Sequence, residues 1–144
     1  MSDRMILVVE DDPGDQMLLR MALESGPTKP KLRMFETCED ALAFLAQSTR
    51  DANGASPNKI GLLLLDFNLP GMNGNEMVAR VRASSQTRFL PAVILSGSAR
   101  DIDVAAAYAS GANAYVRKAL DFEKFVQSLQ SIITFWLHEN VQPG

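Results

Sequence analysis

Polar residues that could do chemistry follow four separate apolar runs of this sequence. They are Glu10, Asp11 and Asp12 after residues 5–9, Asp66 and Asn68 after residues 60–65, Ser96 after residues 91–95, and Lys118 after residues 112–116. Clustered carboxylates repel one another, and a hard divalent cation such as Mg²⁺ relieves that repulsion through oxygen ligands. Beside such a cation, Asp66 could attack phosphorus as a nucleophile, with Ser96 and Lys118 stabilising the transferring group.

Taken one at a time, each of these residues also has a purely structural explanation. Three successive acids after a strand could cap the next helix and interact with its dipole. Asp66 could be a turn residue before Asn-Leu-Pro-Gly, Ser96 a helix cap, and Lys118 a solvated surface lysine. Their joint occurrence after four separate runs is what indicates one shared site.

The apolar runs have the patterns of β-strands, and helical patterns separate them. Residues 5–9, 60–65 and 91–95 are apolar almost throughout, which predicts strands buried on both faces. Two further strands are predicted, an edge strand at 31–36 and a short strand at 112–116, and a polar loop is predicted at 49–59. Helices are predicted from Pro13 to before Gly26-Pro27, around 41–45, around 77–81, and at 102–109, where Gly111 ends the helix.

Five β–α repeats in succession predict an α/β fold with a doubly wound, five-stranded parallel sheet and helices on both faces. In such folds, sites lie in the crevice at the carboxyl ends of the strands. The polar residues listed above follow those ends, so the fold predicts that they meet at one rim.

Composition limits the classes of function that the chain can have. It has 144 residues, enough for about one domain, and 47% are hydrophobic, enough for a real core. A formal net charge of -3 argues against a nucleic-acid-binding surface. Cys38 is the one cysteine, no secretory signal is apparent, and no apolar stretch approaches a membrane span. We therefore expect a cytoplasmic protein without membrane contact, a single domain over 1–144 and no output domain.

The chain resembles the receiver domains of two-component response regulators, as in chemotaxis regulators. The motifs that carry the resemblance are ILVVEDD, LLLLDFNLPGMNG, VILSGS and AYVRK, in this order. They cover essentially the whole chain. The resemblance implies a flavodoxin-like (βα)5 fold with strand order 2-1-3-4-5.

For the metal and the acceptor, the resemblance implies a role for four residues. Asp66 is expected to be the phosphoacceptor and to contact Mg²⁺. Asp11 is expected to be a direct metal ligand, with Glu10 acting nearby through water. The backbone carbonyl of Asn68 is expected to be a further ligand.

For the switch, the resemblance implies that Ser96 supplies a hydroxyl to the phosphoryl group and that Lys118 pairs with it. Tyr115 is expected to be the aromatic residue that changes rotamer on activation. The chain departs from the family at Ala119, where receivers usually have proline after a cis peptide bond. A cis bond to alanine would cost about 2.5–4 kcal/mol, so the geometry of this bond is open.

A narrower resemblance points to stand-alone response regulators paired with bacterial and cyanobacterial phytochromes. Its features are EDDPGD, the polar loop at 49–59, the missing proline after Lys118, and the ending SIITFWLHENVQPG. Those proteins are phosphorylated by a light-regulated sensor histidine kinase and tend to dimerise.

The last predicted helix runs from Asp121, as N-cap, to Glu139 and would be ~28 Å long. Its sheet-facing residues are expected to be Phe122, Phe125, Val126, Leu129, Ile132, Ile133 and Trp136. Phe135, Leu137 and Val141 are then surplus, and could be covered by a second copy. The expected homodimer uses the fourth helix, fifth strand, fifth helix and tail (121–144); alternatively, these residues fold back on their own domain.

The leading hypothesis is a signalling receiver, not an enzyme, that takes phosphate onto Asp66 from a sensor histidine kinase and loses it slowly. It would relay the change by protein contact. One alternative is a pseudo-receiver that binds partners without phosphorylation. A poorer one is a haloacid-dehalogenase-like phosphatase with an aspartyl-phosphate intermediate, because Asn68 replaces its second aspartate.

Overall fold

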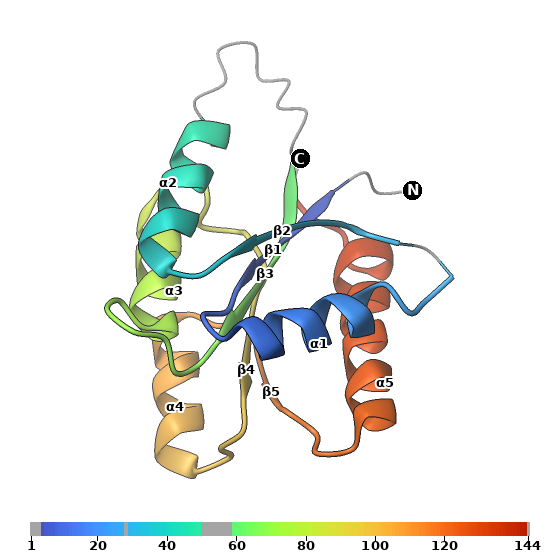
Figure 1. Ribbon diagram of the computed structural model, residues 1–144. Helices are drawn as coiled ribbons and strands as arrows, with labels where there is room; N and C mark the ends of the chain where they lie inside the picture. Colours follow the sequence, from blue (N-terminus) through green and yellow to red (C-terminus); the bar gives the residue numbers. More distant parts are fainter. Residues whose placement is uncertain (1–3, 28, 50–58, 144) are drawn as a thin grey trace.

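The computed structural model describes residues 4–27, 29–49 and 59–143, which form one parallel sheet and the helices around it (Figure 1). The strands are β1 (Met5–Val9), β2 (Lys31–Phe35), β3 (Ile60–Asp66), β4 (Ala92–Ser96) and β5 (Ala114–Arg117). The helices are α1 (Pro13–Leu23), α2 (Cys38–Thr49), α3 (Gly74–Ala83), α4 (Asp101–Ser110) and α5 (Phe122–Ile133), followed by the π-helical turn η1 (Thr134–Glu139).

The sheet has five strands in the order β2-β1-β3-β4-β5, and every neighbouring pair is parallel. The predicted fold class and strand order are therefore confirmed. Most of the polar loop predicted at 49–59 lies outside the described residues, because α2 extends to Thr49 and 50–58 are not described.

Helices cover both faces of the sheet. Helices α1 and α5 lie against one face, and α2, α3 and α4 lie against the other (Figure 1). Alternate residues of one strand serve the two cores: Ile6 and Val8 pack under α1 and α5, whereas Leu7 and Val9 pack under α2 and α3. This double burial explains why the central strands are apolar at consecutive positions.

Strand β2 is an edge of the sheet and shows the alternation that the sequence predicts. Lys31 and Arg33 are exposed, and charged side chains on an edge discourage pairing with another chain. The Arg33 guanidinium lies 4.7 Å from the centre of the Phe44 ring and 5.4 Å from that of Phe35, which covers two aromatic side chains on α2 and β2.

The helix boundaries follow from capping residues. Asp12 caps α1 by accepting the Asp15 N–H, and Pro13 occupies the first turn as predicted. Asp121 caps α5 in the same way, by accepting from the Glu123 N–H. Helix α4 ends at Gly111, whose φ of 108° is left-handed and suits glycine. Helix α1 stops at Leu23, before the predicted Gly26.

The last helix begins after Asp121 and ends at Glu139 as predicted, but it is not α-helical throughout. The chain is α-helical only to Ile133, and a π-helical turn then changes the face that each side chain presents. As a result Leu137, predicted to be surplus, is buried, while Phe135 and Val141 are exposed. Phe122, predicted to face the sheet, is 39% exposed.

Leu137 is buried against the beginning of β3, where Gly61 lies beneath it. A Cβ atom at position 61 would lie 2.8 Å from Leu137 Cδ2 and 2.6 Å from Arg4 Cβ, too close for either contact. The Gln142 amide donates to the Gly61 carbonyl (2.9 Å) and to the Trp136 carbonyl (3.0 Å), so the segment after η1 is fixed to the same place. The last turn thus folds back on its own domain.

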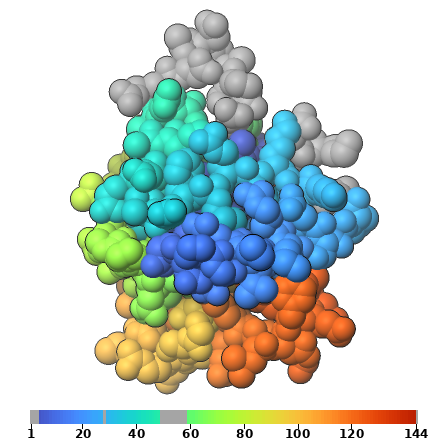
Figure 2. Space-filling view, in the orientation of Figure 1, coloured from blue at the N-terminus to red at the C-terminus, as the bar shows by residue number. Residues whose placement is uncertain are grey.

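The space-filling view shows α1 across the front of the molecule (Figure 2). Met17, Leu18 and Met21 of α1 are exposed apolar side chains. No helix among the described residues is long and apolar enough to cross a membrane.

Candidate functional site

Parallel register brings the predicted site residues to one edge of the sheet. Glu10 directly follows β1, Asp66 ends β3, Ser96 ends β4, and Lys118 directly follows β5. Asp66 lies beside Leu95, the residue before Ser96, and Ser96 lies beside Arg117, the residue before Lys118. The expectation that four strand ends deliver their polar residues to one rim is confirmed.

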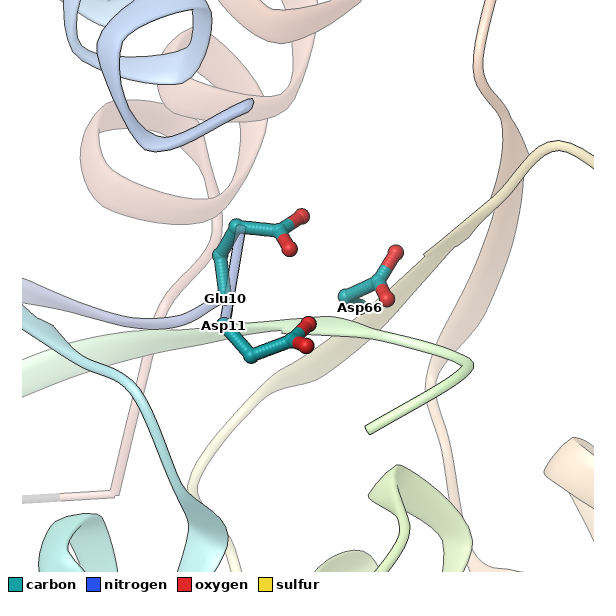
Figure 3. Close-up of side chains that lie close together, drawn as sticks. All are labelled: Glu10, Asp11 and Asp66. Atoms are coloured by element: carbon teal, nitrogen blue, oxygen red, sulfur yellow. The ribbon is translucent and has the colours of Figure 1, made fainter. Parts of the chain in front are cut away.

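Three carboxylates meet at this rim. One oxygen each from Glu10, Asp11 and Asp66 lies within 4.8 Å of the others, and the side chains point toward a common space (Figure 3). Glu10 is buried (1% exposed), Asp66 is partly buried and Asp11 is exposed. Such an oxygen-only set, open to solvent on the Asp11 side, fits a hard divalent cation that keeps some of its waters.

Lys118 supplies the positive charge of the site. Its Nζ lies 2.6 Å from Asp66 Oδ1, 3.3 Å from Glu10 Oε1 and 4.0 Å from Asp15 Oδ2. The side chain of Lys118 is 24% exposed, so the ammonium is held at the rim and not in bulk water. Sequence reasoning missed Asp15, because an acid in the first turn of a helix usually serves only the dipole.

Burial and repulsion raise the pKa of both inner carboxyl groups. For Glu10 and Asp66 the main cause is removal from water, and negative charges nearby add to it; the Lys118 ammonium offsets this in part. Burial alone would lower the pKa of Lys118, but its contacts with Asp66 and Glu10 raise it above the usual value. The site therefore holds more negative charge than its own lysine neutralises, which favours a bound cation.

Short contacts after β1 hold Glu10 in place. The Asp12 N–H donates to Glu10 Oε2 (3.1 Å), and the Gln16 side-chain amide donates to the Glu10 carbonyl (2.6 Å). Asp12 itself caps α1, so of the three successive acids two line the site and the third has the structural role.

The loop after β3 also contacts the site. Asn68 is exposed, and its backbone N–H lowers the pKa of the Asp66 carboxyl against the effect of burial. Whether the Asn68 carbonyl binds a metal stays a prediction.

Ser96, Ser98 and Tyr115 form a connected group beside the carboxylates. Ser96 is buried (1% exposed), and its Oγ accepts the Ser98 N–H (3.0 Å). The Tyr115 hydroxyl donates to the Ser98 carbonyl (2.8 Å), and its ring packs edge-on against Phe67 with ring centres 6.0 Å apart. The predicted switch residues are thus joined through Ser98.

The peptide bond between Lys118 and Ala119 is trans, as are all peptide bonds in the described part of the chain. Lys118 reaches Asp66 without the proline that receivers usually have at this place.

A parallel sheet of order 2-1-3-4-5 with an acidic cluster and a lysine at its rim defines the class of signalling receivers. Comparison with protein families agrees, since residues 6–130 match the response regulator receiver domain. The chain therefore belongs to this family and is a receiver of two-component signalling.

Two relatives with solved structures are similar over nearly their whole length. The response regulator Rcp1 of Synechocystis sp. is 31% identical over 141 residues, covering 98% of this chain and 94% of the relative. Its Mn²⁺-bound structure matches with a TM-score of 0.79 at 30% identity, over 97% of this chain and 99% of the other. The phosphorylated cyanobacterial phytochrome response regulator RcpA matches with a TM-score of 0.83 at 28% identity, over 97% and 98%.

Proposed function

We propose that Asp66 accepts a phosphoryl group from the phosphohistidine of a sensor kinase. An oxygen of the Asp66 carboxylate forms a bond to phosphorus while the phosphorus–nitrogen bond breaks, and the imidazole leaves with the electron pair and takes up a proton. The observation that carries the proposal is the cluster of Glu10, Asp11 and Asp66 with the Lys118 ammonium beside it. The Nζ atom of Lys118 lies 2.6 Å from Asp66 Oδ1.

The surrounding residues would each serve the transfer. Asp11 and Asp66, with Glu10 through water and the Asn68 carbonyl, would hold Mg²⁺, which supplies charge neutralisation for the phosphoryl oxygens. Lys118 would move from the Asp66 oxygen to a phosphoryl oxygen. Ser96, buried beside this rim, would donate its hydroxyl to another oxygen, and Tyr115 would follow through Ser98.

The relatives support a phytochrome-type kinase as the source of phosphate. RcpA is a phytochrome response regulator, and Rcp1 binds Mn²⁺ in its solved structure. We propose the same pairing here, with output by protein contact in the cytoplasm from a single domain. The kinase would approach over the rim and α1, where Met17, Leu18 and Met21 are exposed.

A homodimer through α4, β5 and α5 with the following tail is part of the proposal. Burial of Leu137 leaves less surplus apolar surface than the sequence predicted, but Phe135 (47% exposed) and Val141 (92% exposed) remain uncovered within one chain. Analytical ultracentrifugation of the protein beside a Phe135→Ser variant tests this, and equal association of the two would contradict it.

Intact mass after incubation with acetyl phosphate tests the acceptor. We expect one phosphoryl adduct that requires Mg²⁺ and is absent from Asp66→Asn, because the amide cannot act as the nucleophile. Acetate leaves with the electron pair of the broken phosphorus–oxygen bond. An adduct on Asp66→Asn at the same rate would contradict the assignment of Asp66, and no adduct on either protein would favour a phosphorylation-independent module.

A further inference from the structure

Ser98, in the loop between β4 and α4, bonds through three of its groups at once. Its N–H donates to Ser96 Oγ (3.0 Å), and its carbonyl accepts from the Tyr115 hydroxyl (2.8 Å). Its own hydroxyl donates to Asp103 Oδ2 (3.0 Å). Ser98 thus connects the two switch residues to a carboxylate of α4.

Asp103 is itself fixed by Arg100. The guanidinium donates from Nε to Oδ2 (2.9 Å) and from Nη2 to Oδ1 (3.2 Å), a fork that holds the plane of the carboxylate. The Asp103 side chain is only 14% exposed, while that of Arg100 is 73% exposed. Hydrogen bonds from Arg100 and Ser98 hold the pKa of Asp103 below its usual range, so the group is an anionic acceptor at neutral pH.

The first turn of α4 has no conventional cap to account for this arrangement. Arg100 is the N-cap residue, and its side chain makes no cap hydrogen bond. The Arg100 N–H instead donates to Ser98 Oγ (3.3 Å), so Ser98 is held from two directions. Asp103 is therefore one of the groups that hold Ser98 in place.

We propose that Asp103 is a positioning residue for Ser96, an inference that rests on the proposed phosphorylation of Asp66. By fixing Ser98, Asp103 keeps the Ser98 N–H on the Ser96 hydroxyl and holds that hydroxyl in its resting position. When the Ser96 hydroxyl turns to a phosphoryl oxygen on Asp66, the Ser98 N–H must either move with it or lose its hydrogen bond to Ser96. The hydrogen bond between Ser98 and Asp103 opposes both changes. A contact present only in the resting state makes the phosphorylated state harder to reach, and its loss shifts the equilibrium the other way.

Asp101 offers a matched control for Asp103. Both are acids in the first turn of α4 and both favour its dipole, but Asp101 is exposed and lies outside the Ser98 contacts. Asp103→Ala and Asp101→Ala therefore remove the same charge from the same turn, and only the first releases Ser98. Asp103→Asn keeps one acceptor oxygen and serves as the conservative variant.

The rate of adduct formation from acetyl phosphate with Mg²⁺ is the first readout. We expect Asp103→Ala to react about three-fold or more faster than wild type, Asp103→Asn to lie between, and Asp101→Ala to stay within about 1.5-fold. Equal rates for Asp103→Ala and Asp101→Ala would overturn the proposal. Absence of any adduct on wild type would instead overturn the proposed function. If circular dichroism shows Asp103→Ala unfolded, Arg100→Ala replaces it with the same expected direction.

Backbone amide resonances give a readout that a merely structural role would not move. In unphosphorylated Asp103→Ala, we expect the signals of Gly97 and Tyr115 to shift part of the way along the line from resting to phosphorylated wild type. Ser98→Ala removes the same hydrogen bond from its other end, so its rate increase and that of Asp103→Ala should not add in the double variant. Shifts in unrelated directions, or fully additive rates, would contradict the coupling.

Discussion

Lys118 and Arg82 are two half-buried cations in opposite surroundings. Lys118 lies among carboxylates at the rim, whereas the partners of Arg82, at the end of α3, are all neutral oxygens among the described residues. Its guanidinium donates to the carbonyls of Gly111 (2.9 Å) and Leu90 (2.7 Å) and to the side chain of Asn113 (2.6 Å). Burial lowers the pKa of Arg82, while acidic neighbours raise that of Lys118.

The difference separates a structural cation from a functional one. Arg82 donates to carbonyl and side-chain oxygens where α3, β4 and the turn before β5 meet, and these hydrogen bonds join the three segments. Beside Lys118, the carboxyl groups of Glu10 and Asp66 keep raised pKa values, because burial outweighs the effect of the ammonium. The surroundings of Arg82 stabilise the fold. Those of Lys118 retain repulsion between carboxylates, which a bound cation would relieve before a phosphoryl group is taken up.

The largest effect on stability is expected at Arg82. Arg82→Ala leaves the Gly111 and Leu90 carbonyls and the Asn113 side chain without these donors, and we expect the free energy of unfolding to fall by about 2–3 kcal/mol. Urea denaturation measures it. Arg80→Ala, an exposed arginine of the same last turn, should change it by less than about 0.5 kcal/mol. Equal losses of stability in Arg82→Ala and Arg80→Ala would contradict the structural role of Arg82. Loss of phosphorylation in a folded Arg82→Ala variant would contradict it as well.

A smaller effect of opposite sign is expected at Asp66. Because burial raises its pKa, the ionised carboxylate is disfavoured in the folded protein, and Asp66→Asn should stabilise the protein by about 1 kcal/mol at neutral pH. The measurement is urea denaturation in EDTA. Loss of stability in this variant would mean that the bond to Lys118 outweighs the burial of the charge.

The smallest effect is the pH dependence of the stability that Asp66→Asn gains over wild type. A group whose pKa is raised on folding contributes stability below its ordinary pKa, 3.8 for Asp66, and loses it as pH rises through the folded value. The stability difference between Asp66→Asn and wild type should therefore be small near pH 4 and grow toward about pH 7. Part of this difference comes from Glu10, because the Asp66 charge that raises the pKa of Glu10 is absent from the variant. A constant difference across this range would show that Asp66 has no raised pKa.

Patterned features of the molecule could be predicted from the sequence, and side-chain geometry could not. The apolar runs at β1, β3 and β4 determine both the sheet and the rim, so the places of Glu10, Asp66, Ser96 and Lys118 follow from strand order. The contact between Ser98 and Asp103 spans a loop without periodicity, and in the sequence Arg82 looks like any basic residue near a helix end. The π-helical turn after Ile133 was missed because a pattern of 3.6 residues per turn gives no sign of it.

Gly61 could serve to sort receivers by the path of their last segment. A side chain at this position would meet Leu137 and Arg4, so in a chain with alanine or a larger residue there one of these two segments must shift. In a multiple alignment, this column would then distinguish the receivers whose own final segment covers the amino-terminal ends of the strands. In receivers without the glycine, the amino-terminal ends of the strands would be left for a neighbouring chain to cover.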